Sequence, residues 1–434
     1  MRETHREWLT TILGSVAEWR SGGTPSKSRE DYWSGDIPWL SPKDMKVFAL
    51  SDTQDHLSLR ALADGARYAP AATVFIVVRG MILAHTFPVC VAEKPMAFNQ
   101  DVKAVVPNAL TDGRFLAHWF VGRSHALLGL VTEATHGTKR IDLKELLEFR
   151  ISLPSVPEQA RIAEILDTVD DAIRKTEEII AKLEQVKQGL LHDLLTRGID
   201  DNGELRDPER HPEQFKDSPN GRIPRPWATL ELGRCLLGSP YNGIYKPAHL
   251  IGRGTLLIGQ AAFTADRTID FSMSRRAMLS SAEVDRYRLI PGDILVSRVF
   301  ATLNGVGQPV LVRELPEPAV YESNMMRLRI DQHLMRPPWV FHCLRGRVVR
   351  RLVESGATLS NQASINQGTL LRLPIPAPEI HEQERILERL SALDCRREAE
   401  QSELAKLQLL KQGLMEDLLT GRVRVTNLLG QAAE

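Results

Sequence analysis

The sequence is short of the residues and runs that mark secreted, membrane and metal-binding proteins. Its 434 residues include only four cysteines, and no two of them form a CxxC pair: Cys90, Cys235, Cys343 and Cys395. This spacing argues against a zinc site and a disulfide framework, so we expect reduced, structural thiols and no bound metal. The N-terminus is charged and the longest apolar run, near 71–78, is too short to cross a bilayer, which predicts a cytoplasmic protein.

The sequence also lacks recognisable catalytic motifs. It contains no GxxxxGK phosphate loop, HExxH, GxSxG or Asn-Pro-Pro-aromatic motif, and no convincing PD…ExK nuclease pattern. Its acidic pairs, Asp170-Asp171 and Glu177-Glu178, are more typical of a solvated helix face than of acid–base catalysis. We therefore expect a binding protein with no catalytic residues and no cofactor of its own.

The most informative feature that is present is a duplicated helix. Residues 158–196 align without a gap with residues 382–420 at an offset of 224, and 18 of the 39 pairs are identical. Apolar residues in each copy follow the 4,3 spacing of a coiled-coil seam. Each helix follows a mixed, turn-rich segment of about 150 residues, a typical size for one globular domain.

This organisation predicts a pseudo-twofold tandem repeat of the α/β (α+β) class. Short β-like runs lie at 72–78, 101–106, 254–258 and 294–296, and helical patterns lie at 114–130 and 338–353. The expected boundaries are a first globule at 1–155, a helix at 156–198, an ordered extended linker at 199–226, a second globule at 227–377, a helix at 378–422 and a tail at 423–434.

A zero net charge conceals an uneven distribution. Residues 222–377 carry 20 basic and 11 acidic side chains, a balance of +9, and 19 of the basic residues are Arg, with Lys246 the exception. Arg can hold phosphate or guanine through two parallel hydrogen bonds, so this balance favours a polyanion as partner. General use of Arg as a surface charge is the alternative explanation.

At this point the arrangement resembles a known family, the specificity subunits of type I restriction-modification systems. The resemblance covers nearly the whole chain and is strongest where segments 153–159 and 378–383 lead into the helices, and in the KQGL…DLLT endings at Lys187 and Lys411. The runs 22–27 (GGTPSK) and 33–39 (WSGDIPW) resemble the start of a first target recognition domain, and 98–101 (FNQD) fits it too. The second globule lacks GTPSK and GDIPW and matches more loosely.

The resemblance implies two target recognition domains joined by two long antiparallel helices. Each domain would read one half of a split, asymmetric site in double-stranded DNA, while the helices set the unread spacing. Two modification subunits that use S-adenosylmethionine to methylate adenine, and two restriction subunits that use ATP and Mg, would supply the catalysis. This chain would choose the site.

Sequence readout needs hydrogen-bonding side chains on loops that can enter a groove. The candidate DNA-binding residues are Thr24, Ser26, Lys27, Lys139, Arg140, Tyr241, Asn242, Lys246, Arg298, Asn361 and Gln362. We expect Trp33 and Trp39 to anchor the core or a loop. Glycine in a helix costs about 1 kcal/mol against alanine, so we expect another helix to approach Gly189 and Gly413 closely. The residues expected to contact the partner helix or another subunit are Gln159, Lys187, Gly189, Gln383, Lys411 and Gly413.

Two other functions fit the same observations. The chain could be the specificity chain of a combined restriction-methylation enzyme. The sequence alone separates this function poorly from that of a type I specificity subunit. It could also be a coiled-coil scaffold whose globules bind protein, although the Arg-rich second globule argues against this. Binding to heparin or phosphocellulose would discriminate the scaffold from the DNA-binding functions.

Overall fold

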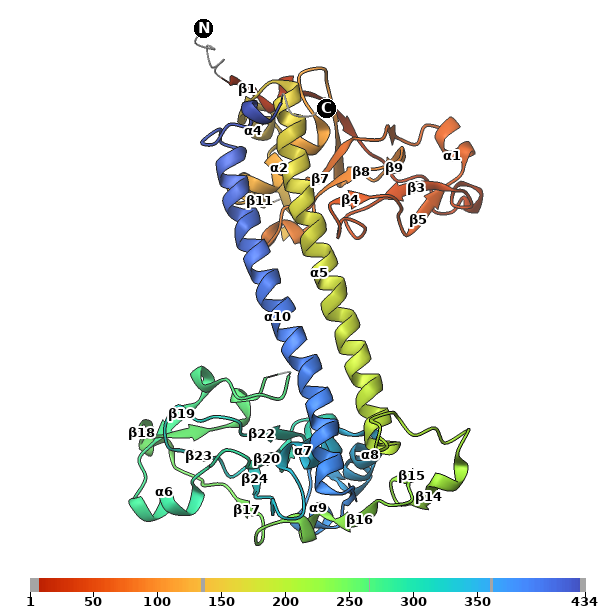
Figure 1. The fold of residues 1–434 in the computed structure, drawn as a ribbon. Coiled ribbons are helices and arrows are strands. Elements are labelled where there is room, and N and C mark those ends of the chain that lie inside the picture. Colours follow the sequence, from red (N-terminus) through yellow and green to blue (C-terminus); the bar gives the residue numbers. More distant parts are fainter. Residues whose placement is uncertain (1–7, 134–136, 265, 360–361, 430–434) are drawn as a thin grey trace. The chain divides into compact units, whose positions relative to one another are not determined.

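A computed structural model of the chain describes residues 8–133, 137–264, 266–359 and 362–429. The chain divides into two compact units: unit 1 comprises residues 1–178 and 401–434, and unit 2 comprises residues 179–400. Each unit therefore contains one globule together with a part of each long helix (Figure 1). No helix in the described ranges is both long and apolar enough to cross a membrane.

Unit 1 is built around a five-stranded sheet with the order β2-β10-β7-β8-β4. Its central strand β7 has the sequence VFIV and is buried on both faces, as expected for a continuous apolar run. A second sheet has the order β5-β3-β9-β6, and two-stranded pairs join β1 to β13 and β11 to β12. The strands are β1 Leu9–Ile12, β2 Ala17–Ser21, β3 Ile37–Leu40, β4 Ala49–Leu50, β5 Asp55–Leu57, β6 Tyr68–Ala69, β7 Val74–Val77, β8 Val89–Ala92, β9 Met96–Phe98, β10 Val102–Pro107, β11 Val131–Glu133, β12 Lys139–Ile141 and β13 Arg150–Leu153.

Unit 2 repeats this plan with one strand fewer in its main sheet, which has the order β17-β24-β20-β22. Smaller sheets have the orders β19-β18-β23, β21-β26-β25, β16-β27 and β14-β15. The strands are β14 Phe215–Ser218, β15 Gly221–Pro224, β16 Ala228–Glu231, β17 Tyr241–Asn242, β18 Ile251–Ile258, β19 Arg275–Ala277, β20 Ile294–Ser297, β21 Val299–Phe300, β22 Pro309–Leu311, β23 Ala319–Tyr321, β24 Met325–Leu328, β25 Thr358–Leu359, β26 Ala363–Ser364 and β27 Pro374–Ala377.

Short helices cover the sheets and are fixed at their starts by side-chain caps. Asp112 accepts from the Phe115 amide at the start of α2, and Ser280 and Glu283 form a capping box at the start of α6. The short helices are α1 Leu59–Ala63, α2 Gly113–Gly122, α3 Ser124–Leu128, α4 Leu143–Glu148, α6 Ser281–Tyr287, α7 Pro337–Arg345, α8 Arg347–Gly356 and α9 Gln367–Leu371.

The duplicated sequence forms α5, Val156–Thr196, and α10, Ile380–Leu418. In unit 1 the start of α5 packs beside the end of α10, because Ile162 and Leu166 share one buried core with Leu418. In unit 2 the roles are exchanged, and the end of α5 shares a core with the start of α10. The two helices are therefore antiparallel within each unit, as the fold class predicted.

Several expected elements differ in detail. The helical patterns at 114–130 and 338–353 are each broken into two helices, at Arg123 and at Gly346. The linker contains the β14-β15 hairpin as well as extended chain. Three cysteines are buried and all four are free, but Cys395 is exposed on α10, so the expectation of a structural role is wrong for this thiol.

Candidate nucleic-acid interface

The loop that follows β2 is pressed against the end of β9. Gly23 N donates to Phe98 O at 2.9 Å. A methyl group on Gly22 would lie 2.0 Å from Asn99 O, so only glycine allows this approach. The loop therefore leaves β2 at a position fixed by its backbone.

Two tryptophans bind the backbone of the same loop. Trp39 Nε1 donates to Gly23 O at 3.1 Å and Trp33 Nε1 donates to Ser26 O at 3.2 Å. Their rings meet edge to face with centroids 5.0 Å apart. The expectation that these tryptophans are anchors is confirmed.

The side chains of this loop face solvent. Thr24, Ser26 and Lys27 are exposed, and Thr24 Oγ1 donates to Gln100 Oε1 at 2.6 Å. Gln100, which the sequence prediction missed, therefore lies with Thr24 at the strand-end edge. We call Thr24, Ser26, Lys27 and Gln100 the first reading edge.

Lys139 and Arg140 are on β12, which is connected to the same region. Arg79 donates to Asp101 at 2.6 Å and its backbone bridges Arg140. Arg140 is exposed, whereas Lys139 Nζ is paired with Glu133 at 2.8 Å. Arg140 is thus the better placed of the two for a new contact.

Unit 2 repeats this frame with different side chains. A methyl group on Gly243 would lie 2.1 Å from Glu322 O, and Ile244 N donates to Tyr321 O at 2.9 Å. Gly243 therefore holds the position of Gly22, and Tyr245 that of Thr24. Tyr245 is 76% exposed and was missed by the sequence prediction.

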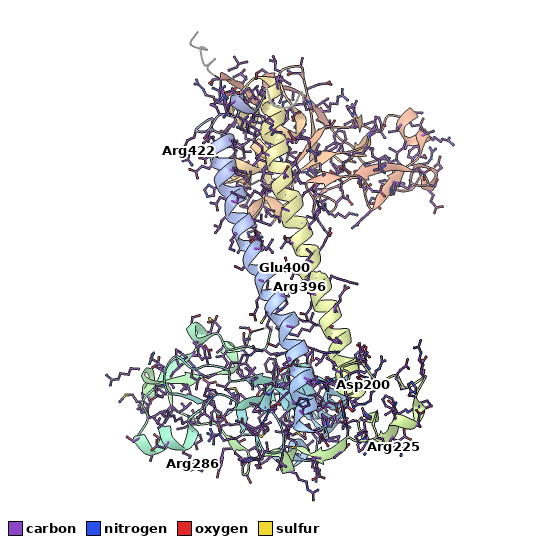
Figure 2. All side chains as sticks on the ribbon, in the orientation of Figure 1. Asp200, Arg225, Arg286, Arg396, Glu400 and Arg422 are labelled. Atoms are coloured by element: carbon purple, nitrogen blue, oxygen red, sulfur yellow. The ribbon has the colours of Figure 1, made fainter. Side chains whose placement is uncertain are left out.

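The candidates around this second loop have different surroundings. Lys246 Nζ is bound by Glu283 at 2.7 Å, and this bond with the capping contacts lowers the pKa of Glu283 to about 2. Tyr241 is 47% exposed, and Arg286 of α6, labelled in Figure 2, lies over its ring at 5.8 Å. Lys246 is therefore already committed to an internal ion pair. Ser323 N donates to Ile244 O at 3.1 Å, so Ser323 holds the position of Gln100. We call Tyr241, Asn242, Tyr245 and Ser323 the second reading edge.

The remaining candidates are placed differently. Asn242 and Gln362 are exposed, and Asn361 lies outside the described residues. Arg298 is half-buried, with its Nε atom buried and unbonded within the described chain. Arg298 N and Val299 N both donate to Asn324 O, just as Val78 N and Arg79 N donate to Asp101 O. Arg298 therefore corresponds to Val78.

The six residues expected to contact the partner helix or another subunit are two lysines, two glutamines and two glycines. Lys187 Nζ lies 2.5 Å from Asp394 Oδ1 in unit 2, and Lys411 Nζ lies 2.5 Å from Asp170 Oδ1 in unit 1. Because each lysine and each aspartate is the other's counterpart at the 224-residue offset, the two pairs are equivalent. Both lysines thus contact the partner helix.

The two glutamines were assigned incorrectly. Gln159 is fully buried: its amide accepts from Asp112 N and donates to Leu110 O and Pro154 O. Gln383 is also fully buried and repeats this pattern with Arg336 N, Leu334 O and Pro378 O. Each glutamine therefore fastens the start of a long helix to its own globule and is unavailable to another subunit.

The expectation for the mid-helix glycines is also wrong within the described chain. A methyl group on Gly189 or Gly413 would meet no atom within 4 Å, so no helix of this chain approaches them. Both are exposed. Contact with another subunit is the part of that expectation that stays a prediction.

Each unit has a groove near its exposed glycine, where the end of a long helix meets the break between two short helices. In unit 1 the groove measures about 410 Å³ and includes Gly122, Gln412 and Met415. In unit 2 it measures about 260 Å³ and includes their counterparts Gly346, Gln188 and Leu191. The grooves are equivalent at the 224-residue offset.

Known proteins are similar to this chain in sequence. Residues 5–185 match the family model described as the type I restriction modification DNA specificity domain. The specificity subunit of the type I restriction enzyme EcoR124I/EcoR124II of Escherichia coli is 36% identical over 171 residues, 39% of this chain and 42% of that protein. The MjaVIII specificity subunit of Methanocaldococcus jannaschii is 23% identical over 97% of this chain and 94% of that protein. The first of these matches therefore spans less than half of the relative.

Solved structures show the same fold. The type I restriction-modification S subunit of M. genitalium superposes with a TM-score of 0.55 and 12% identity, covering 96% of this chain and 98% of that one. A chain from a structure on complex assembly and conformational transition of the type I R-M system gives a TM-score of 0.57 and 15% identity, with coverage of 95% and 97%. Residues 5–185 of this chain thus match a type I restriction modification DNA specificity domain, and nearly the whole chain is similar to specificity subunits of type I restriction-modification systems.

Proposed function

We propose that this chain recognises a bipartite, asymmetric DNA site, one half with each globule. The observation that carries the proposal is the frame built twice, with a glycine pressed against a strand end and exposed polar side chains beside it. The frame is common to both units, but Thr24 and Gln100 are replaced by Tyr245 and Ser323. A shared scaffold with different exposed groups is what two unlike half-sites require.

The two reading edges differ in the chemistry that they offer. Hydroxyl and amide groups, as in Thr24 and Gln100, can exchange hydrogen bonds with base edges in the major groove. Tyr245 adds an aromatic face and a phenol that can contact a base or sugar. Arg140 and Arg286 lie on elements beside the edges and are suited to phosphate contacts, which position a protein without reading sequence.

We propose that the catalysis comes from partner subunits. The relatives of this chain are named specificity subunits, and the sequence predicts no catalytic residues of its own. Two modification subunits carrying S-adenosylmethionine would methylate adenine, and two restriction subunits using ATP and Mg would translocate and cut DNA. DNA as substrate would place the complex in the cytoplasm.

The equivalence of the two grooves is an argument for the proposal that two copies of one modification subunit bind this chain. Gln188 and Gln412 line the two grooves at identical positions, and Gly189 and Gly413 beside them are exposed with open space around them. A single partner surface can therefore meet both units in the same way. Gly189→Arg and Gly413→Arg should each remove one copy, and the matched substitutions Gly189→Ala and Gly413→Ala should remove neither.

Methylome sequencing tests the function. A host expressing the chain with its neighbouring modification subunit should gain N6-methyladenine in a two-part motif, and the motif should vanish when only this gene is deleted. An active, expressed modification subunit whose methylation pattern ignores the deletion would contradict the proposal and favour the scaffold function.

A further inference from the structure

Unit 1 has an edge strand with no counterpart among the described residues of unit 2. β4 pairs in parallel with β8, where Val91 N donates to Phe48 O at 2.7 Å and Glu93 N donates to Leu50 O at 2.9 Å. In unit 2 β22 pairs with β20 as β8 pairs with β7, but β22 is the last strand of its sheet (Figure 1). No strand in the described part of unit 2 therefore occupies the fifth place of the second sheet.

The vacancy has a cause in the chain's path. In unit 1 residues 41–54 connect β3 to β5 and include β4. The corresponding residues 259–274 connect β18 to β19, and their Asp266 pairs with Arg397 on α10 at 3.2 Å. The segment that could supply the strand is thus held elsewhere in unit 2.

The backbone N–H and C=O groups on the side of β22 that faces away from β20 are available to a further strand. Val312 N donates to Asp293 O at 2.9 Å and Ser297 N donates to Gln308 O at 3.1 Å. Ile294 and Leu311 are therefore a non-hydrogen-bonded pair, and the N–H and C=O of Leu311 point away from β20. Leu311 and Arg313 hold the positions of Val91 and Glu93, the two residues that bind β4.

A cavity of about 620 Å³ lies beside this edge. Its lining comes from β22 and the residues after it, from α7 and from α10, and includes Leu311, Arg313, Phe341 and His342. His342 is only 6% exposed, and its Nδ1 atom is buried with no hydrogen-bond partner among the described residues. His118 Nδ1 in unit 1 is also buried with no partner among the described residues, so this feature is common to the two histidines.

The counterpart of His342 in unit 1 is fully enclosed. His118 Nε2 lies 2.9 Å from Asp167 Oδ1, and the His118 ring stacks on Phe48 with centroids 4.3 Å apart. In unit 2 Ser391 stands in place of Asp167, and no strand among the described residues brings a phenylalanine to His342. The missing strand and the missing aromatic contact of His342 are consequently one feature.

We propose that the edge of β22 binds an extended segment of a partner protein, which adds as a fifth, parallel strand and places an aromatic side chain against His342. Adding a strand to an exposed edge is a common mode of peptide recognition, in which backbone hydrogen bonds supply affinity and side-chain pockets supply specificity. The Phe48 segment of unit 1 is the internal example of such an occupant.

Charge indicates a further property of the partner segment. Arg313 takes the place of Glu93 and has no ion pair within the described ranges, whereas Asp394 and Glu384 of the same cavity are paired with Lys187 and Arg336. Glu388 lines the α10 side. An acidic residue two to four positions after the aromatic one would complement Arg313. The protein's own segment 46–52, KVFALSD, has this pattern.

A synthetic peptide of residues 45–53 tests the proposal on the full-length chain, without DNA or partner subunits. We expect saturable binding with a Kd of about 0.1–1 mM, because the free peptide must lose conformational freedom. Arg313→Glu and Leu311→Pro should each weaken binding at least about tenfold. Arg313 is exposed, so Arg313→Glu should leave folding intact and is the deciding variant. Pro309 shows that the β22 backbone accepts proline at an outward position, but Leu311 is only 8% exposed, so Leu311→Pro also removes a core side chain and its folding is checked by urea unfolding. A peptide with Phe48→Ala is the matched control and should not bind.

Hydrogen exchange gives an independent readout. In the chain alone the amides of Leu311 and Arg313 should exchange faster than those of Val91 and Glu93, and saturating peptide should slow them. The proposal is overturned if the peptide fails to bind at about 5 mM, well above the expected Kd. It is also overturned if both variants bind as the wild type does, or if the Leu311 and Arg313 amides are already protected in the free chain.

Discussion

Lys187 on α5 pairs with Asp394 on α10, and the residues 224 positions away from each, Lys411 and Asp170, form the same pair with the helices exchanged. One duplicated helix therefore supplies both halves of each contact. The lysine that is repeated in both helices thus pairs with the partner helix.

We predict that the pair in unit 2 contributes more stability than the pair in unit 1. The Lys187 and Asp394 side chains are 12% and 13% exposed, against 24% and 22% for Lys411 and Asp170. Lys187→Met should cost about 1–3 kcal/mol and Lys411→Met about 1 kcal/mol, because screening by solvent weakens the more exposed pair. Urea unfolding of double-mutant cycles measures both couplings. Strictly additive single changes would show that the pairs do not interact.

The buried glutamines should be more important for stability than for assembly. Gln159→Leu leaves the Asp112 N–H without its acceptor in a buried site, which should cost about 1–3 kcal/mol. Gln383→Leu should cost a similar amount, because Arg336 N loses its hydrogen-bond acceptor in the same way. Denaturant unfolding gives the values, and the exposed substitution Gln188→Leu is the control. A normal stability with lost subunit binding would instead restore the original subunit-contact assignment.

Gly22 should be essential to the first reading edge, whereas its neighbour should not. Gly22→Ala forces a methyl group onto Asn99 O, while Gly23→Ala meets no atom within 4 Å. We expect at least a tenfold loss of DNA affinity for the first change and nearly normal affinity for the second. Fluorescence anisotropy with the recognised duplex at fixed salt is the measurement. Equal affinities of the two variants would mean that this loop does not contact DNA.

Acid should destabilise unit 2 through His342. Burial, aided by the charges of Arg345 and Lys187 and opposed by Asp394, lowers the pKa of His342 from 6.5 to about 3. Between these values the unfolded chain binds a proton that the folded chain excludes, so stability falls with decreasing pH, by up to about 1.4 kcal/mol per pH unit. His342→Phe should remove this contribution. If wild type and variant unfold with the same pH dependence from 7 to 4, the histidine is not excluded from protonation.

The sequence predicted the long helices well because their signal is local and duplicated. The 4,3 pattern and the identical ends identified α5 and α10, and the lysine contacts followed from the same alignment. It failed for Gln159 and Gln383, since hydrogen bonds to Asp112 N and Arg336 N depend on packing between segments far apart in the chain.

The reading edges were predicted only in part. The motif at 22–27 identified Thr24, but Gln100 joins it from the end of β9 through a contact 76 residues away in the sequence. In the second globule the sequence identified Tyr241 and Asn242 but missed Tyr245, because the role of Gly243 appears only in its close approach to Glu322 O. An alignment anchored on the glycine after β17 would have found it.

The central claim is that the two globules read separate halves of one DNA site, and methylome sequencing of paired variants tests it most directly. Cells would carry the modification subunit with the wild-type chain, with Thr24→Ala and Gln100→Ala together, or with Tyr245→Ala and Asn242→Ala together. The account predicts that the first pair of changes relaxes or alters only one half of the methylated motif and the second pair only the other half. Changes in both halves from either pair, or an unaltered motif from both with methylation intact, would contradict it.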